Sequence, residues 1–166
     1  MRSAITSLAL VLAFAGAAPL HAQQAAKAGT IQLRNVAEKE VTETDAGGKA
    51  VAHRVPAAKA VPGEEVIYTS TFRNIGARPA GDIVVSNPIP PHTTYVGGSA
   101  FGDNTAIAFS TDGGKSWAPA DKLKVRAADG KERPAAVTDI THVRWTYRGE
   151  LPPARESSVG FRVTVN

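Results

Sequence analysis

Strands with a period of two, separated by glycine and proline turns, constrain this fold more than any other feature of the sequence. The first run reads Pro62-Gly-Glu-Glu-Val-Ile-Tyr-Thr-Ser-Thr-Phe-Arg-Asn-Ile-Gly-Ala77. One face of the resulting strand carries Val66, Tyr68, Ser70 and Phe72, the pattern of a half-buried β-strand. The next run, Asp82-Ile-Val-Val-Ser-Asn-Pro-Ile-Pro-Pro91, ends at prolines, which cannot donate ladder hydrogen bonds. The pattern predicts an antiparallel β-sandwich.

The end of the chain shows the same period. The apolar residues of the two final runs are Val143, Trp145 and Tyr147, then Val159, Phe161, Val163 and Val165. We expect two strands, joined through residues 149–156, with both apolar sets on one inward face. Trp145 is then a core residue rather than a sugar-binding platform. No segment of the mature chain has helical periodicity over about ten residues, so we expect no substantial helix.

Weaker patterns predict the remaining elements. Residues 30–44 alternate irregularly and are rich in Glu and Lys, which predicts an edge strand, followed by a turn at 45–49. Residues 51–61 and 93–96 read as extended. Residues 106–118 resemble a hairpin around Asp112-Gly-Gly-Lys115, residues 123–126 could extend it, and residues 127–138 read as a loop.

The first 22 residues have the plan of a secretory signal peptide. Arg2 supplies a short positive region, an apolar run follows, and small residues precede Gln23. Cleavage is expected between Ala22 and Gln23. The run is shorter than the roughly 20 residues that span a bilayer, and no later run approaches that length. We therefore expect a protein without a membrane span after cleavage, located in the periplasm or secreted.

The mature chain is long enough for one domain. Removal of residues 1–22 from the 166-residue chain leaves 144 residues, and the chain has no cysteine, hence no disulfide. We expect a flexible lead-in at 23–29, an edge-strand segment at 30–61 and the sandwich at 62–166, with 30–166 folding as one unit. Residues 31–61 could pair with their own sheet or with that of a neighbour.

Six short motifs resemble one known family when they are taken in order. They are Pro62-Gly-Glu-Glu-Val-Ile-Tyr68, Asn74-Ile-Gly-Ala-Arg-Pro-Ala80, Ser86-Asn-Pro-Ile-Pro90, Thr94-Tyr-Val-Gly-Gly-Ser99, Thr141-His-Val-Arg-Trp145 and Val159-Gly-Phe-Arg-Val163. They resemble the conserved repeat domain of bacterial exported proteins, also called domain of unknown function eleven. The resemblance covers residues 36–166 and implies an immunoglobulin-like β-sandwich of the cell envelope. It carries no catalytic residues. This chain departs from it in its single copy, in Asn87 where the family commonly has Asp, and in the inward Ser70.

One motif resembles the Asp box of sialidases and other propeller proteins. It is Ser110-Thr-Asp-Gly-Gly-Lys-Ser-Trp117, with Ser110, Asp112, Gly114 and Trp117 at the characteristic positions. Asp112 can accept hydrogen bonds from the turn, Gly114 can adopt a positive φ, and Trp117 can pack beneath. One copy cannot build a propeller, so we expect a structural turn, with a ligand or calcium site as the alternative.

Other candidate chemistry has little support in the sequence. The Asp residues lack calcium-loop spacing, and no two of the mature chain's histidines have ligand spacing. No Gly-x-Ser-x-Gly elbow or phosphate-binding loop is present. The formal charge of +4, or +3 without Arg2, is spread singly rather than in a basic face, which argues against nucleic-acid binding. We predict no catalytic residue, no metal and no cofactor.

A basic stripe is the remaining candidate surface. His142, Arg144, Arg148 and Arg162 fall on the outward registers of the last two strands or just beyond them. They could pair with Thr and Glu on a solvated sheet, or bind an acidic envelope polymer or protein. The predicted function is a non-enzymatic structural or interaction module of the bacterial envelope, binding an envelope protein or polysaccharide. The alternatives are a carbohydrate-binding module and a hydrolase with an Asp-box hairpin. The sequence predicts no oligomeric state.

Overall fold

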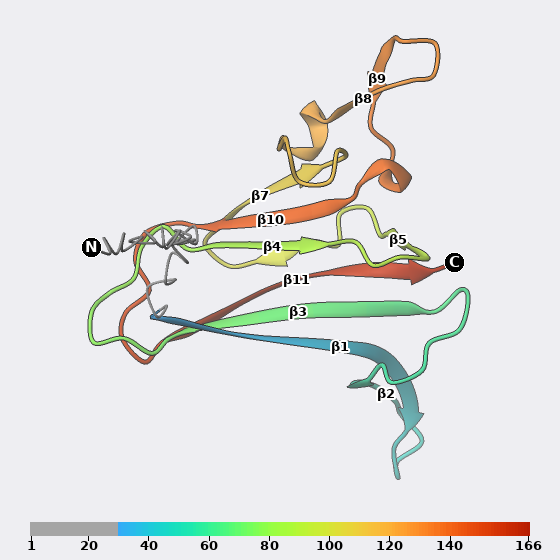
Figure 1. The fold of residues 1–166 in the computed structure, drawn as a ribbon. Helices are drawn as coiled ribbons and strands as arrows, with labels where there is room; N and C mark the ends of the chain where they lie inside the picture. The colour runs from blue at the N-terminus through green and yellow to red at the C-terminus, as the bar shows by residue number, and fades with distance from the viewer. Residues whose placement is uncertain (1–29) are drawn as a thin grey trace, which may run out of the picture.

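The computed structural model describes residues 30–166, which form an all-β sandwich of antiparallel sheets (Figure 1). The large sheet contains, in spatial order, β2 (Ala50–Pro56), β1 (Ile31–Thr44), β3 (Glu65–Asn74), β11 (Glu156–Val165) and β5 (Thr93–Tyr95). A short strand, β6 (Phe101–Gly102), also pairs with β11. The small sheet contains β4 (Val84–Pro88), β10 (His142–Tyr147) and β7 (Thr105–Ser110). The signal-peptide and cleavage-site predictions, including Ala22 and Gln23, lie outside the described residues.

The core lies between the two sheets and is rich in aromatic rings. Trp145 of the small sheet has its ring centroid 6.0 Å from that of Phe161 of the large sheet. Tyr68 stacks on Phe161 at 5.6 Å, and Phe72 is buried on the same face of β3. The predicted inward registers of these strands are confirmed. Burial of such rings supplies much of the driving force for folding.

Strand β1 agrees only in part with the prediction of an edge strand at residues 30–44. Its first half, residues 31–38, pairs with β3, and its second half, residues 38–44, pairs with β2. The edge of the large sheet is therefore β1 itself over residues 31–37 and β2 beyond them. The Glu and Lys residues of β1 all lie between positions 38 and 43, in the half that leaves the sandwich and pairs with β2. Residues 31–38 pair with β3 of their own chain, and the segment therefore adds to its own sheet.

The last two long strands correct a second expectation. They are not neighbours, because β10 pairs with β4 and β7 while β11 pairs with β3, β5 and β6. Their apolar faces oppose each other across the core. A period of two shows which side chains are buried but not which strands pair. The link between them contains Pro152, Pro153 and Ala154, the last with a φ of 61°, and it crosses from one sheet to the other.

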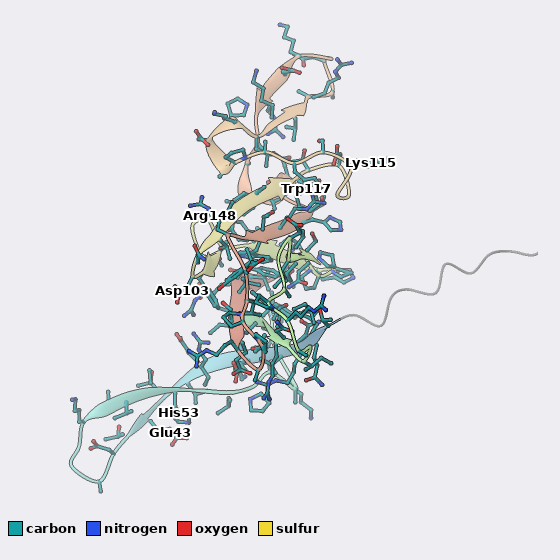
Figure 2. The ribbon with its side chains drawn as sticks, turned by 90° about the vertical axis from the view of Figure 1, so that its left-hand side faces the viewer. Glu43, His53, Asp103, Lys115, Trp117 and Arg148 are labelled. Carbon is teal, nitrogen blue, oxygen red and sulfur yellow. The ribbon has the colours of Figure 1, made fainter. Side chains whose placement is uncertain are left out.

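Two hairpins project from the sandwich in opposite directions (Figure 2). One, here called the β1–β2 arm, consists of residues 38–56, with Glu43 and His53 facing each other near its end. The other pairs β8 (Lys124–Arg126) with β9 (Glu132–Pro134). Residues 123–126 therefore do not extend the 106–118 hairpin, and the predicted loop at 127–138 contains a strand. The second strand of the 106–118 hairpin is reduced to one bridge, between Phe109 and Ala118.

Helical structure within residues 30–166 is limited to two single 3₁₀ turns, η1 (Ala120–Lys122) and η2 (Val137–Asp139). This agrees with the expectation of no substantial helix. None of the helices in this part of the chain has the length and apolar character needed to cross a bilayer.

Candidate contact surfaces

The turn after β7 is organised around the Asp112 carboxylate. Its Oδ1 accepts hydrogen bonds from the backbone N–H groups of Lys115 (3.0 Å) and Ser116 (2.9 Å) and from the Ser110 hydroxyl (2.7 Å). Its Oδ2 accepts one from the Ser116 hydroxyl at 2.6 Å. Gly114 has a φ of 84°, which few other residues adopt without strain. The carboxylate thus replaces the backbone partners that this turn lacks.

These hydrogen bonds also fix the charge of Asp112. The Ser116 hydroxyl, followed by the Ser116 N–H and the Ser110 hydroxyl, holds the pKa of the Asp112 carboxyl well below its ordinary value. The carboxyl is therefore ionised throughout the physiological pH range. All four of its partners belong to the turn itself, so its geometry is that of a structural carboxylate.

Trp117 closes the turn and covers the outer face of β10. Its indole Nε1 donates to the Gly114 carbonyl oxygen at 3.0 Å. The Arg144 guanidinium lies 3.8 Å from the Trp117 ring centroid, a cation–π contact, and the His142 ring meets the indole edge-on at 6.3 Å. The Arg144 Nε also donates to the Ser86 hydroxyl of β4 at 3.2 Å. His142, Arg144 and Trp117 therefore form one cluster on the outer face of the small sheet.

The structure does not bring the four residues of the predicted basic stripe together. His142 and Arg144 lie on the small sheet, whereas Arg162 lies on β11 of the large sheet and faces the opposite side of the sandwich. Arg148 follows β10 in the loop toward Leu151, where its N–H donates to the Asn104 carbonyl oxygen at 2.8 Å (Figure 2). The prediction of a basic stripe is wrong because β10 and β11 belong to different sheets.

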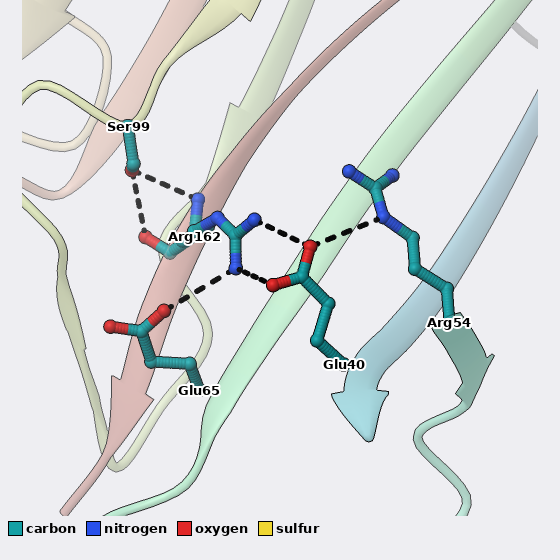
Figure 3. Close-up of polar contacts among 5 residues, drawn as sticks. All are labelled: Glu40, Arg54, Glu65, Ser99 and Arg162. Atoms are coloured by element: carbon teal, nitrogen blue, oxygen red, sulfur yellow. Dashed lines mark hydrogen bonds and ion pairs between the residues drawn. The ribbon is translucent and has the colours of Figure 1, made fainter. Parts of the chain in front are cut away.

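Arg162 is the centre of a separate ionic network, shown in Figure 3. Its guanidinium binds Glu40 of β1 in a bidentate pair, at 2.8 and 3.1 Å, and also Glu65 of β3 at 3.5 Å. Arg54 of β2 contacts Glu40 at 3.7 Å. The pair with Arg162 lowers the pKa of Glu40, and Glu40 in turn raises the pKa of Arg162. The network joins four strands and attaches the base of the β1–β2 arm to the sandwich.

Ser70 of β3 and Asn87 of β4 contact each other in the space between the two sheets. The Asn87 amide Nδ2 donates to the Ser70 hydroxyl at 2.8 Å, across the space between β4 and β3. Ser70 is only 1% exposed, so an unpaired hydroxyl there would be costly. Each residue therefore supplies the hydrogen-bond partner that the other needs.

A cavity of about 270 Å³ opens between the sheets on the side of β5 and β7. This β5–β7 cavity is roofed by residues 120–140. Its larger lining side chains are Tyr95, Ile107, Phe109, Leu123, Val137 and Ile140, and the rest of the lining is glycine and alanine. No acidic or basic side chain contributes to this wall.

Sequence reasoning missed this cavity and the Arg162 network. Both depend on residues distant in sequence, such as Glu40 with Arg162 or Tyr95 with Leu123. The local signal for the cavity is limited to Leu123, Val137 and Ile140, three apolar residues within or beside the segment 127–138 that the sequence predicts to be a loop. Among residues 30–166, no group of three His, Cys, Asp or Glu side chains is arranged to hold a metal ion.

Comparison with known proteins identifies no similar protein. No family model, no curated protein and no solved structure matches this chain.

Proposed function

We propose that this protein is an exported, non-enzymatic interaction module of the bacterial cell envelope, with an immunoglobulin-like sandwich as its scaffold. The signal-like N-terminus supports export. The two facing antiparallel sheets, with Trp145 between them, support the immunoglobulin-like arrangement implied by the resemblance to the conserved repeat domain.

The β1–β2 arm is the observation on which this proposal rests. Most of its side chains are exposed. In the pairing of β1 with β2, three valines, Val41, Val51 and Val55, lie on one face of the hairpin. Thr42, Ala52 and Arg54 lie on the other face. A two-stranded hairpin alone is marginally stable in water. The arm adds little to the core. It is anchored at its base, by the Arg162 network and by the ion pair of Lys39 with Glu64 at 2.9 Å, and therefore offers contact area instead.

The outer edge of β2 provides a way to bind a protein partner. Within the described chain β2 pairs only with β1, so the backbone groups on its other edge have no strand beside them. Such an edge can accept an extended segment as an added strand. A protein of the cell envelope that presents an extended segment is the partner that this geometry favours.

Affinity capture from the native envelope tests this function. The mature protein, beginning at Gln23, is compared with a variant in which residues 42–52 are replaced by Asn-Gly. We expect an envelope protein to be retained by the mature protein and lost with the shortened arm. Equal retention by both proteins, or unprocessed chain in the cytoplasm, would contradict the proposal.

Carbohydrate binding is the second candidate, and Trp117 is the observation that favours it. This indole is partly exposed on the small sheet beside Arg144 and Ser86, residue types that commonly bind sugars. However, the Arg144 guanidinium already covers one face of the ring. Binding on a glycan array that is abolished by Trp117→Ala would establish this role in place of the first.

A further inference from the structure

The β5–β7 cavity has the shape and polarity of a small-molecule site. Its wall combines strands of both sheets with the roof at residues 120–140, and the Tyr95 and Phe109 rings lie 5.4 Å apart within it. An apolar cavity of about 150 Å³ is large enough for benzene. The 270 Å³ found here leaves space for an aromatic ring with a substituent.

The wall selects against charge. No acidic or basic side chain lines the cavity, so an ionic ligand would lose its hydration without gaining a partner. An uncharged ligand loses little on entry and gains contact with Leu123, Ile140 and the two rings.

Tyr95 supplies one polar group at this wall. The residue is only 3% exposed, and its hydroxyl oxygen accepts a hydrogen bond from the N–H of Ala100, which also lines the cavity, at 3.2 Å. A phenolic hydroxyl can donate one hydrogen bond as well. Within residues 30–166, no hydrogen bond uses the Tyr95 hydroxyl as donor.

We propose that the β5–β7 cavity binds a small, uncharged aromatic molecule whose hydrogen-bond acceptor is met by the Tyr95 hydroxyl. The roof is held in place before any ligand arrives. Arg133 and Asp139 form a bidentate pair at 2.6 and 2.9 Å, Asp139 also accepts from the Ala136 N–H, and the Ala135 N–H donates to the Leu123 carbonyl oxygen. A pre-formed wall reduces the entropy lost on binding. This site is independent of the proposed role of the β1–β2 arm.

Titrations followed by two-dimensional amide NMR test the proposal with three probes of similar size. Acetophenone has a ring and a carbonyl acceptor, cumene has the ring without an acceptor, and benzoate carries a charge. We expect acetophenone to give saturable shifts at the amides of Gly97, Gly98 and Ala100. Benzoate should give none. The proposal would be overturned if acetophenone caused no chemical-shift change at these amides, or if the changes were scattered over the surface.

Variants separate the polar group from the cavity itself. Tyr95→Phe keeps the ring and should lower the affinity for acetophenone about fivefold, the factor for one neutral hydrogen bond. The affinity for cumene should stay within about twofold of its wild-type value. Ala135→Leu places a larger side chain at the wall and should abolish binding of both. Ala52→Leu, on the exposed strand β2, is the matched control and should change neither. An equal loss of acetophenone and cumene in Tyr95→Phe would overturn the role of the hydroxyl.

Discussion

Trp145 shows how one residue can dominate the stability of a small sandwich. Its side chain is 1% exposed and lies against Phe161 of the opposite sheet. Its indole Nε1 is buried and has no hydrogen-bond partner among residues 30–166. The ring therefore stabilises the fold through its volume and its contacts, at some cost from the unpaired N–H.

Trp145→Ala should lower the free energy of unfolding by about 3–5 kcal/mol, because it leaves a cavity the size of a large aromatic ring. Trp145→Phe should lower the free energy of unfolding clearly less, since a ring remains and no hydrogen bond is lost. Chemical denaturation with urea measures both values. A loss below about 1 kcal/mol for Trp145→Ala would show that the side chain does not lie in the core.

The Ser70–Asn87 contact should behave as a coupled pair. A double-mutant cycle with Ser70→Ala and Asn87→Ala is expected to give an interaction free energy of about 1 kcal/mol, typical of a neutral hydrogen bond. The double variant should then be less destabilised than the sum of the single variants. Strict additivity would mean that the two side chains do not contact each other.

Acid should destabilise the protein partly through the Asp112 turn. Because the folded-state pKa of Asp112 lies below its ordinary value of 3.8, ionisation stabilises the folded protein above that pH. This contribution is lost as the pH falls through 3.8 toward the lower folded-state pKa. Glu40, Glu64 and Asp139 also have lowered pKa values and act in the same direction.

Melting temperatures recorded between pH 7 and pH 2.5 measure this effect. In Asp112→Asn, the melting temperature should be lower at neutral pH and should fall less steeply below pH 4. Asp121→Asn, on an exposed carboxylate of η1, is the control and should keep the wild-type slope. An unchanged acid slope in Asp112→Asn would contradict the assigned hydrogen bonds.

At the level of elements, β1 combines two environments in one strand. Residues 31–38 pair with β3, and at the end of this half the Ala57 N–H of the same chain donates to the Ala37 carbonyl oxygen at 2.9 Å. Residues beyond 38 pair only with β2 and are largely exposed. The first half is therefore part of the scaffold, and the second half is free to serve as a contact element.

Shortening the arm should leave the sandwich intact. Replacement of residues 42–52 by Asn-Gly is expected to change the free energy of unfolding by no more than about 1 kcal/mol, since it removes mainly exposed side chains. By contrast, Val36→Pro removes a backbone N–H that faces β3 inside the scaffold half and should destabilise far more. Urea denaturation of both variants tests this division, and global unfolding of the shortened protein would contradict it.

The sequence predicts those features of these elements that depend on residues close together in the chain. The faces of β3, β10 and β11 follow from period-two patterns around Tyr68, Trp145 and Phe161, and these were predicted. Strand neighbours were not, because pairing is decided between distant segments, and the error over β10 and β11 led directly to the false basic stripe. The Asp112 turn could be anticipated because the hydrogen bonds of the Asp112 carboxylate all come from residues 110–116.

At the level of the whole molecule, the two sheets differ in width. The large sheet continues past β3 through β1 and β2, whereas the small sheet ends at β4. Leu33 lies on the inward register of β1, opposite Phe72, and is nevertheless 50% exposed, because the small sheet does not reach it. The sandwich with its two projecting hairpins forms an extended molecule, with one hairpin at each end (Figure 2).

Strands β10 and β11 belong to different sheets and face each other through their aromatic side chains, and the rest of the fold depends on this arrangement. Nuclear Overhauser spectroscopy of the folded protein tests it most directly, because only two tryptophans are present and each indole can be assigned. We expect cross-peaks from Trp145 to Phe161 and from Tyr95 to Phe109, the pairs that span the two sheets. Absence of both contacts, with the Trp145 indole exchanging freely with water, would contradict it.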